Sequence, residues 1–187
     1  MSKPVLQVVV SSVRPSRVSP IVAEWFAEEA RKHGAFEVEV TDLAELNLPL
    51  MDEPNHPIMQ AYQHEHTKRW ANIVERSDAF VFVVPEYDHG YPAPLKNAID
   101  YLFKEWAYKP VSFVSYGGIS AGLRAVQQLK PVLSALKMVP ITEQVMIPMI
   151  GAHIVDGKFA PNEIIAESVA PALDELAKME RALASLR

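Results

Sequence analysis

Cysteine is absent from this chain of 187 residues. Its absence excludes disulfide bonds, thiolate nucleophiles and cysteine-ligated metal centres. Basic residues are fewer than acidic ones: the chain has 18 Lys and Arg residues and 23 Asp and Glu residues, which gives a formal net charge of −5. Proteins that act mainly on nucleic acid need a basic face, so this balance argues against nucleic acid as a partner.

Long apolar runs are missing as well. No stretch approaches the length of a membrane span, so we expect no membrane association. The first apolar stretch begins at Val5, directly after Met1-Ser2-Lys3-Pro4, which leaves no room for a signal peptide. We therefore expect a cytoplasmic protein. The length, with 49% apolar and 22% charged residues, suits one well-buried domain that covers residues 1–187.

Several functional motifs are also absent. Neither Gly-x-x-x-x-Gly-Lys-Ser/Thr nor Gly-x-Gly-x-x-Gly occurs, which argues against a triphosphate hydrolase and a dinucleotide site. His-Glu-x-x-His is missing too, and His64 and His66 are two residues apart, so on the helix expected there they would point to different faces. We expect no metal site. No histidine can be assigned as a partner to Ser115 or Ser120, so a serine nucleophile is not expected.

Five apolar stretches alternate with five stretches of helical spacing. The expected strands cover residues 5–10, 36–40, 78–84, 110–116 and 139–147, and the expected helices cover residues 21–33, 58–76, 93–105, 123–136 and 161–186. This alternation predicts an α/β fold with a five-stranded parallel sheet and helices on both faces. The stretch 78–84 is expected in the centre because it is the most apolar, and 36–40 at an edge. A long loop is expected over 42–57 and an irregular tail over 148–160.

The loop at residues 11–19 joins the first expected strand to the first expected helix. It reads Ser-Ser-Val-Arg-Pro-Ser-Arg-Val-Ser, with Ser19 as a candidate N-cap and Pro20 suited to the first helical turn. Hydroxyl groups, free backbone N–H groups at a helix N-terminus and forked guanidinium charge together suit a phosphate. Strand-to-helix loops of this kind also occur without any ligand.

Two further loops are expected at the same edge of the sheet. Ligands bind beyond the carboxyl ends of parallel strands where the strand order reverses, and an order 2-1-3-4-5 places that point between the first and third strands. Residues 85–92 read Pro-Glu-Tyr-Asp-His-Gly-Tyr-Pro and residues 115–118 read Ser-Tyr-Gly-Gly. Such loops can grip a planar heterocycle, although proline and glycine can equally serve only the turns. A mononucleotide held by its terminal phosphate is the ligand that these patterns favour.

The motifs in these loops resemble those of the NADPH-dependent FMN reductase family, which includes quinone, azo-dye and chromate reductases. The family signature Gly-Ser-x-Arg-x-x-Ser-x-Asn is matched by residues 11–19, with Ser11 in place of Gly and with Arg17 and Ser19 in place of Ser and Asn. Pro85-Glu86-Tyr87-Asp88 is similar to Pro-Glu-Tyr-Asn, and the most specific match is Pro94-Leu95-Lys96-Asn97-Ala98-Ile99-Asp100. The resemblance spans residues 5–147 and implies a flavodoxin-like three-layer sandwich.

The resemblance also implies a set of FMN-binding residues. The phosphate would be held by Ser12, Arg14, Arg17, Val18 and Ser19. The isoalloxazine ring would be lined by Pro85, Glu86, Tyr87, Asp88, His89 and Gly90, and its other side would be closed by Ser115, Gly117 and Gly118. No side chain is expected to act as a catalytic acid or base.

By the same resemblance, the chain is expected to pass hydride from NADPH or NADH through bound FMN to a small-molecule acceptor such as a quinone, an azo compound, chromate or free flavin. Members of the family assemble as homodimers or homotetramers. One alternative is an FMN-binding electron carrier that does not oxidise NAD(P)H, although carriers are usually more acidic than this chain. Another is a regulatory or structural dimer that has lost the flavin.

Overall fold

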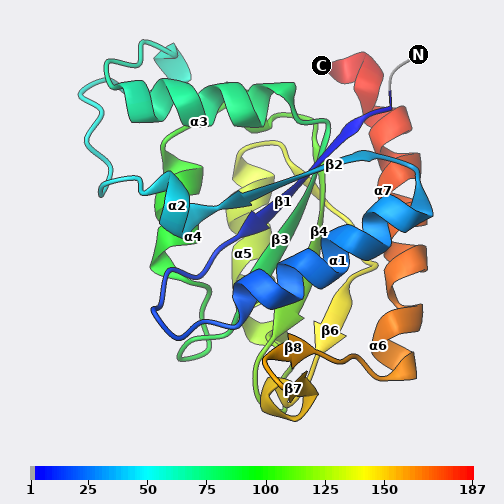
Figure 1. Cartoon of the computed structure of the whole chain (residues 1–187). Coiled ribbons are helices and arrows are strands. Elements are labelled where there is room, and N and C mark those ends of the chain that lie inside the picture. The colour runs from blue at the N-terminus through cyan, green and yellow to red at the C-terminus, as the bar shows by residue number, and fades with distance from the viewer. Residues whose placement is uncertain (1–2) are drawn as a thin grey trace.

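A parallel sheet runs through the middle of the molecule (Figure 1). The computed structural model describes residues 3–187; Met1 and Ser2, on which the argument against a signal peptide partly rests, lie outside them. The strands are β1 (Val5–Val10), β2 (Glu37–Asp42), β3 (Ala79–Pro85), β4 (Pro110–Tyr116), β5 (Val139–Pro140) and β6 (Val145–Ile147). Their order is β2-β1-β3-β4-β5, and β6 also pairs with β4. The predicted order 2-1-3-4-5 is confirmed.

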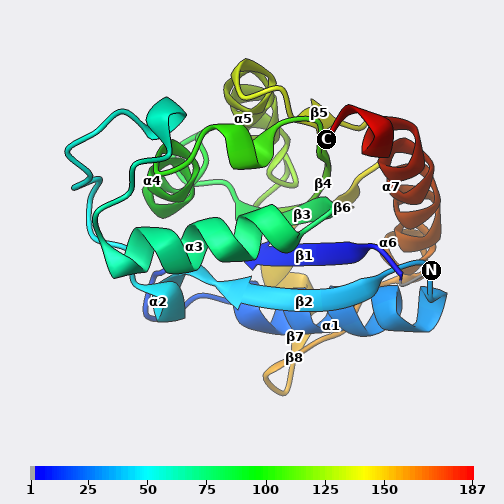
Figure 2. The ribbon, with the colours of Figure 1, turned by 90° about the horizontal axis from the view of Figure 1, so that it is seen from above.

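Helices cover both faces of this sheet, as Figures 1 and 2 show. α1 (Ser19–His33) and α7 (Val169–Leu183) pack on one face, and α3 (Glu65–Arg76), α4 (Ala93–Asp100) and α5 (Leu123–Ala135) pack on the other. The connections hold α2 (Leu43–Leu46), α6 (Glu163–Glu167) and the 3-10 turns η1 (Pro57–Met59), η2 (Lys104–Trp106), η3 (Ile150–His153) and η4 (Ala184–Leu186). The three-layer α/β sandwich is therefore confirmed. None of the helices in residues 3–187 combines the length and the apolar composition that crossing a bilayer requires.

The central strand β3 is buried along its whole length. Its two edges pair with β1 and β4, and helices cover its two faces, so a continuous apolar run is the only composition that suits it. Phe80 and Phe82 pack around the buried Trp106 on the face that carries α3, α4 and α5. The edge strand β2 is only partly buried, as its alternating composition predicted.

Some helix boundaries were predicted wrongly. α3 begins at Glu65 rather than at residue 58, because the Glu53 carboxylate accepts hydrogen bonds from the backbone N–H groups of Gln63 and His64 and holds the preceding segment outside the helix. The predicted C-terminal helix is divided into α6 and α7. Pro171 lacks the N–H group that would bond to the Glu167 carbonyl, and its ring crowds that carbonyl, so the helix breaks between them.

Other differences lie in the last third of the chain and after α4. The predicted strand 139–147 consists of β5 and β6 with a short break between them, where the Ser112 hydroxyl donates to the Glu143 carbonyl at 2.7 Å. The predicted helix 93–105 ends at Asp100 and is followed by η2. The tail predicted to be irregular contains η3 and a small hairpin of β7 (Ile154–Val155) and β8 (Lys158–Phe159).

Candidate functional site

The three loops singled out from the sequence meet at one edge of the sheet. They follow the carboxyl ends of β1, β3 and β4, which are neighbours in the sheet (Figure 1). Together they enclose a cleft of about 230 Å³. Its lining consists of Arg14, Ser16, Arg17 and Val18 from the first loop, Pro85, Glu86 and Tyr87 from the second, Tyr116 and Gly117 from the third, and Ile150.

The residues expected at the site divide into two groups. Those that line the cleft are Arg14, Arg17, Val18, Pro85, Glu86, Tyr87 and Gly117. Those that do not are Ser12, Ser19, Asp88, His89, Gly90, Ser115 and Gly118. Ser19, Asp88 and Gly118 lie directly beside members of the first group in the chain, so the structure brings the expected loops together, but some of their residues do not line the cleft.

Arg17 is held in place by the end of the neighbouring strand β2. Its Nη2 donates to Oδ2 of Asp42 at 2.5 Å, and both side chains are largely buried. The Nε–H group of the same guanidinium is buried and has no acceptor within residues 3–187. Arg17 therefore stands in the cleft wall with one hydrogen bond left unmade, which is costly for a buried donor unless a ligand supplies the acceptor.

The start of α1 differs from the prediction. The helix begins at Ser19 and its N-cap is Val18, so the prediction that Ser19 is the N-cap is wrong. The cause is that the buried Ser19 hydroxyl is hydrogen-bonded to the Tyr116 hydroxyl at the end of β4. Pro20 lies in the first turn as predicted, and no side chain caps that turn. The positive end of the α1 dipole is consequently free to receive an anion.

Two other serines fasten the first loop to β3 and to the loop that follows it. The Ser12 hydroxyl is hydrogen-bonded to the Tyr87 hydroxyl at 2.7 Å, and the Ser11 hydroxyl donates to the Val83 carbonyl at 2.6 Å. Ser11 is fully buried, and this bond satisfies a hydroxyl where the family signature has glycine. The Ser12 hydroxyl also accepts from the Arg14 N–H at 3.4 Å and so keeps one spare hydrogen-bonding position, whereas the Ser19 hydroxyl keeps two, since a hydroxyl has one donor and two lone pairs.

The second loop is a tight hairpin. The N–H groups of Tyr87 and Gly90 each donate to the other residue's carbonyl, at 2.9 Å and 2.8 Å. Asp88 and His89 between them have φ of +49° and +68°, the pattern of a type I′ turn. Asn and Asp tolerate a positive φ better than most residues, which explains why Asp88 suits a position where the family signature has Asn. Its exposed side chain lies at the tip of the turn.

Glu86 ties the second loop to the third. Its side chain is only 6% exposed. The carboxylate accepts hydrogen bonds from Nε of Arg124 at 2.6 Å, from the Ser120 hydroxyl at 2.9 Å and from the Arg124 backbone N–H at 3.2 Å. Burial alone would raise the pKa of Glu86, but these hydrogen bonds and the Arg124 charge outweigh it, so the pKa of Glu86 lies below its ordinary value.

Sequence reasoning missed the partners of Glu86. Ser120 was considered only as a nucleophile and Arg124 was not singled out. Residues 118–122 read Gly-Ile-Ser-Ala-Gly, a Gly-x-Ser-x-Gly pattern between a strand and a helix. The Ser120 hydroxyl nevertheless donates to Glu86, and no histidine bonds to it within residues 3–187, so this turn is not a nucleophile elbow. The sequence did offer one signal. Acidic Glu86 follows β3, and basic Arg124 lies at the start of α5, the helix that follows the neighbouring strand β4.

The third loop is closed on its outer side by the segment that follows β6. Backbone N–H groups of Met149 and Ile150 donate to the carbonyls of Gly118 and Gly117 at 2.9 Å and 3.0 Å. Ile150, in the tail predicted to be irregular, thereby becomes part of the cleft wall. Ser115 lies beneath the loop, fully buried, with a hydroxyl that has no partner among the described residues.

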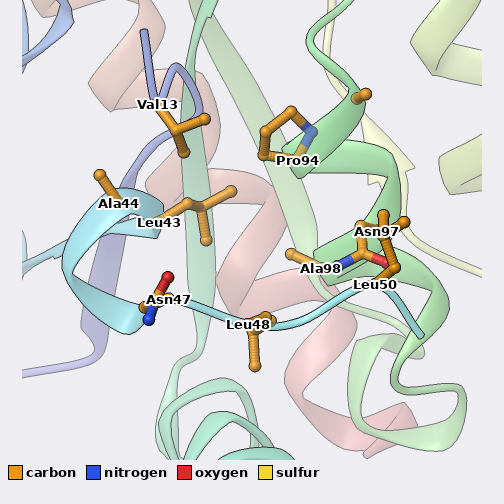
Figure 3. A pocket seen from close by; sticks show the side chains of 10 residues that line it. Val13, Leu43, Ala44, Asn47, Leu48, Leu50, Pro94, Asn97 and Ala98 are labelled. Carbon is orange, nitrogen blue, oxygen red and sulfur yellow. The ribbon is translucent and has the colours of Figure 1, made fainter. Parts of the chain in front are cut away.

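A second, more apolar cleft lies beside the first. It measures about 380 Å³ and is lined by Val13, Leu43, Ala44, Asn47, Leu48, Leu50, Ala93, Pro94, Asn97 and Ala98. Figure 3 shows these side chains converging from the first loop, from α2 and the chain after it, and from α4. The Asn97 amide is already occupied, because it accepts from the Met51 N–H and donates to the Pro49 carbonyl. Leu50, at the rim, is 85% exposed.

His64 and His66 lie apart from the cleft and make local contacts. Within residues 3–187 no group of three His, Cys, Asp or Glu side chains could hold a metal ion. The expectation that His64 and His66 point to different faces is wrong: their rings stack with centroids 5.1 Å apart. His64 is the extended N-cap of α3 rather than part of the helix, so helical spacing does not apply to the pair. His66 pairs with Asp52 at 2.9 Å.

Comparison with known proteins decides the family. A family model described as NADPH-dependent FMN reductase matches residues 5–152. The chain belongs to this family. The assignment confirms the expected oxidoreductase that uses NAD(P)H with FMN as cofactor, and it does not favour the alternative of an electron carrier.

Individual relatives agree with the family assignment. An NAD(P)H-dependent FMN reductase of Schizosaccharomyces pombe is 44% identical over 137 residues, which cover 72% of this chain and 68% of that protein. A quinone reductase of Pseudomonas putida is 37% identical over 132 residues, 65% of this chain and 66% of that protein. The solved flavoenzyme FerB, an NAD(P)H:(acceptor) oxidoreductase of Paracoccus denitrificans, superimposes with a TM-score of 0.74 at 23% identity, covering 96% of this chain and 98% of that chain. This last likeness shows the shared fold.

The lowered pKa of Glu86 predicts a pH dependence of stability in this reductase. Because the folded-state pKa lies below the unfolded value of about 4.3, the ionised carboxylate stabilises the fold above that pH and the contribution is lost as the pH falls through the folded-state pKa. The difference in free energy of unfolding between the wild type and Glu86→Gln should therefore shrink between neutral pH and acid. Urea unfolding followed by circular dichroism measures it.

The matched control for this experiment is Glu24→Gln on α1. Glu24 pairs with Arg31 at 3.0 Å, but both side chains are exposed, and such pairs contribute little. This variant should follow the wild type at every pH. A Glu86→Gln difference that stays constant across the pH range would contradict the prediction.

Proposed function

We propose that the 230 Å³ cleft is the FMN site of this reductase, with the phosphate at residues 11–19 and the ring between the 87–90 hairpin and Gly117. The observation that carries the proposal is the buried Nε–H of Arg17, a donor without an acceptor in the cleft wall. A phosphate monoester would supply that acceptor. Of the second group of expected residues, Ser12, Ser19 and Ser115 would act from behind the lining, and Asp88, His89, Gly90 and Gly118 would lie at its rim.

The donor set suits a phosphate group. Arg14 and Arg17 bring positive charge to the cleft, and the uncapped first turn of α1 adds backbone N–H groups and the positive end of its dipole. The Asp42 carboxylate takes up only Nη2 of Arg17, which orients the guanidinium and leaves the other edge free. Ser12 and Ser19 lie behind the lining and hold the loop in place through their hydrogen bonds to the hydroxyls of Tyr87 and Tyr116.

The other end of the cleft suits a planar ring. Pro85, Tyr87 and Ile150 offer flat or apolar surface, and Gly117 carries no side chain that would keep a ring away from the backbone. FMN bound here would supply the hydride chemistry, accepting from NADPH or NADH and passing electrons to the acceptor. The chain's own residues bind and orient that group and shield one side of it from water, so no side chain needs to act as a general acid or base.

The acceptor that we propose is a small planar or oxidising molecule: a quinone, an azo compound, chromate or free flavin. The quinone reductase of Pseudomonas putida among the relatives supports the first of these. The preference between NADPH and NADH stays open, and steady-state kinetics with both nicotinamides across this set of acceptors would determine it. The cytoplasmic location expected from the sequence stays a prediction.

The function predicts a change of colour. Purified protein loaded with FMN should be yellow, should lose the absorbance of oxidised flavin when NADPH or NADH is added under nitrogen, and should regain it when benzoquinone is added. Free FMN at the same concentration, without protein, is the control for direct reduction. A yellow protein that neither nicotinamide bleaches would instead indicate an electron carrier, and a protein that does not take up FMN would indicate a structural role.

The phosphate assignment predicts a selective loss of affinity. Arg14→Ala should weaken FMN binding by roughly tenfold to a hundredfold, because a charge-assisted hydrogen bond contributes about 1.5–3 kcal/mol. Binding of riboflavin, which has no phosphate, should be unchanged. Flavin fluorescence titration gives both constants, and Arg31→Ala at the far end of α1 is the matched control. Undiminished FMN affinity in Arg14→Ala would refute the assignment.

We also propose that the protein is a homodimer or homotetramer. Large apolar side chains are exposed around the site, including Ile119 at 90% and Leu50 at 85%, and the apolar second cleft opens beside them. A second copy covering this region would remove that surface from water. Analytical ultracentrifugation should give a multiple of the 20.9 kDa chain mass. A monomer mass at micromolar concentration would contradict the proposal.

A further inference from the structure

The Glu86 carboxylate lies between the two loops that form the ring end of the cleft. Its backbone N–H donates to the Tyr116 carbonyl at 3.0 Å, which extends the pairing of β3 with β4 by one residue. Glu86 lines the cleft, and its side-chain carboxylate reaches the start of α5. Glu86, which belongs to the second loop, thus binds the end of β4 through its main chain and the start of α5 through its side chain.

The Glu86 carboxylate caps the N-terminus of α5. The N-cap of α5 is Gly122, which has no side chain to offer, and no side chain from its own end of the helix caps it. Any larger residue is excluded there, because φ is +80° and a Cβ would lie 2.8 Å from the Tyr116 backbone nitrogen. The Arg124 N–H in the first turn is bonded instead to Glu86, 38 residues earlier in the chain. A negative charge at this end also interacts favourably with the helix dipole.

The Glu86 carboxylate is only 6% exposed and accepts three hydrogen bonds, while the Arg124 side chain that pairs with it is 47% exposed. Ser120, the Arg124 side chain and the Arg124 backbone all converge on the one carboxylate, whereas the Lys96–Asp100 and Arg31–Glu24 pairs are solvent-exposed. A buried carboxylate that loses its charged donor is left uncompensated, so Arg124 and Ser120 keep Glu86 in this position. We name the group of Glu86, Ser120 and Arg124 the loop clamp.

We propose that the loop clamp sets the separation of the two walls that hold the flavin ring, and that Glu86 is a positioning residue for that ring rather than a residue that contacts it. The inference rests on the proposed FMN site. Gly117, which lines the cleft, lies against Glu86: a Cβ at Gly117 would be 3.5 Å from the Glu86 Cβ. Tyr87, which also lines the cleft, directly follows Glu86. A change in the loop clamp therefore changes the distance between Tyr87 in the second loop and Gly117 in the third.

The proposal makes a prediction that separates the ring from the phosphate. Glu86→Gln keeps the side-chain shape but presents an amide to the Arg124 donors, so it should weaken binding of FMN and of riboflavin by the same factor, roughly tenfold or more. The ratio of the two dissociation constants should stay at the wild-type value, in contrast to Arg14→Ala. Flavin fluorescence titration measures both constants.

Two further measurements separate positioning from general stability. The visible circular dichroism of bound FMN reports the asymmetry around the ring, and it should change in Glu86→Gln at saturating FMN. In a double-mutant cycle with Arg124→Gln, the double variant should be little worse than either single variant, because each removes the same clamp. Glu24→Gln is the matched control and should leave affinity and dichroism unchanged.

The outcomes are distinct. If the wild type fails to bind FMN, the proposed function fails. If the wild type binds FMN but Glu86→Gln binds both flavins as tightly as the wild type, with only a lower urea midpoint, the clamp serves folding alone and the inference is overturned. A loss confined to FMN, with riboflavin unaffected, would also overturn it, because it would place Glu86 with the phosphate.

Discussion

The pairing of β3 with β1 on one side and β4 on the other is the constraint on which the site depends. Parallel strands end at the same edge, so these three neighbours deliver three loops to one place. The buried strand β3 provides the rigid centre, because both of its faces and both of its edges are occupied. The hydrogen bonds of Ser12 with Tyr87 and of Ser19 with Tyr116 then join the loops directly. A ligand at this edge meets a frame that is largely formed in advance.

Charge in the cleft is balanced in pairs rather than spread evenly. Arg17 is paired with Asp42 at one end, and Glu86 is paired with Arg124 at the other. Each pair fixes a group that would otherwise be mobile, and each crosses between segments far apart in the chain. The first pairing leaves donor capacity on Arg17, whereas the Glu86 carboxylate already accepts three hydrogen bonds. This difference suits an anion at the first end and an uncharged aromatic ring at the second.

Most of the sheet could be predicted from the sequence, because the burial of a strand follows from its local composition. β3 is uniformly apolar, and in β2 apolar and polar residues alternate. The helix limits were less predictable. α3 begins late because Glu53 binds backbone groups ten residues away, and α6 is separated from α7 by Pro171, whose effect is local and could have been anticipated. Ile150 entered the cleft wall only through bonds between its segment and Gly117, which no local pattern indicates.

The chain by itself determined the order of the strands, the edge of the sheet at which the three loops end and which loops gather there, because periodicity and the topology of parallel sheets depend on composition and connectivity alone. Motifs in those loops indicated the family. Only the tertiary structure decided what each polar side chain does, since Ser19, Glu86 and Arg17 could all have faced a ligand. Their partners Tyr116, Arg124 and Asp42 lie 25 or more residues away in sequence, and only folding brings them within hydrogen-bonding distance.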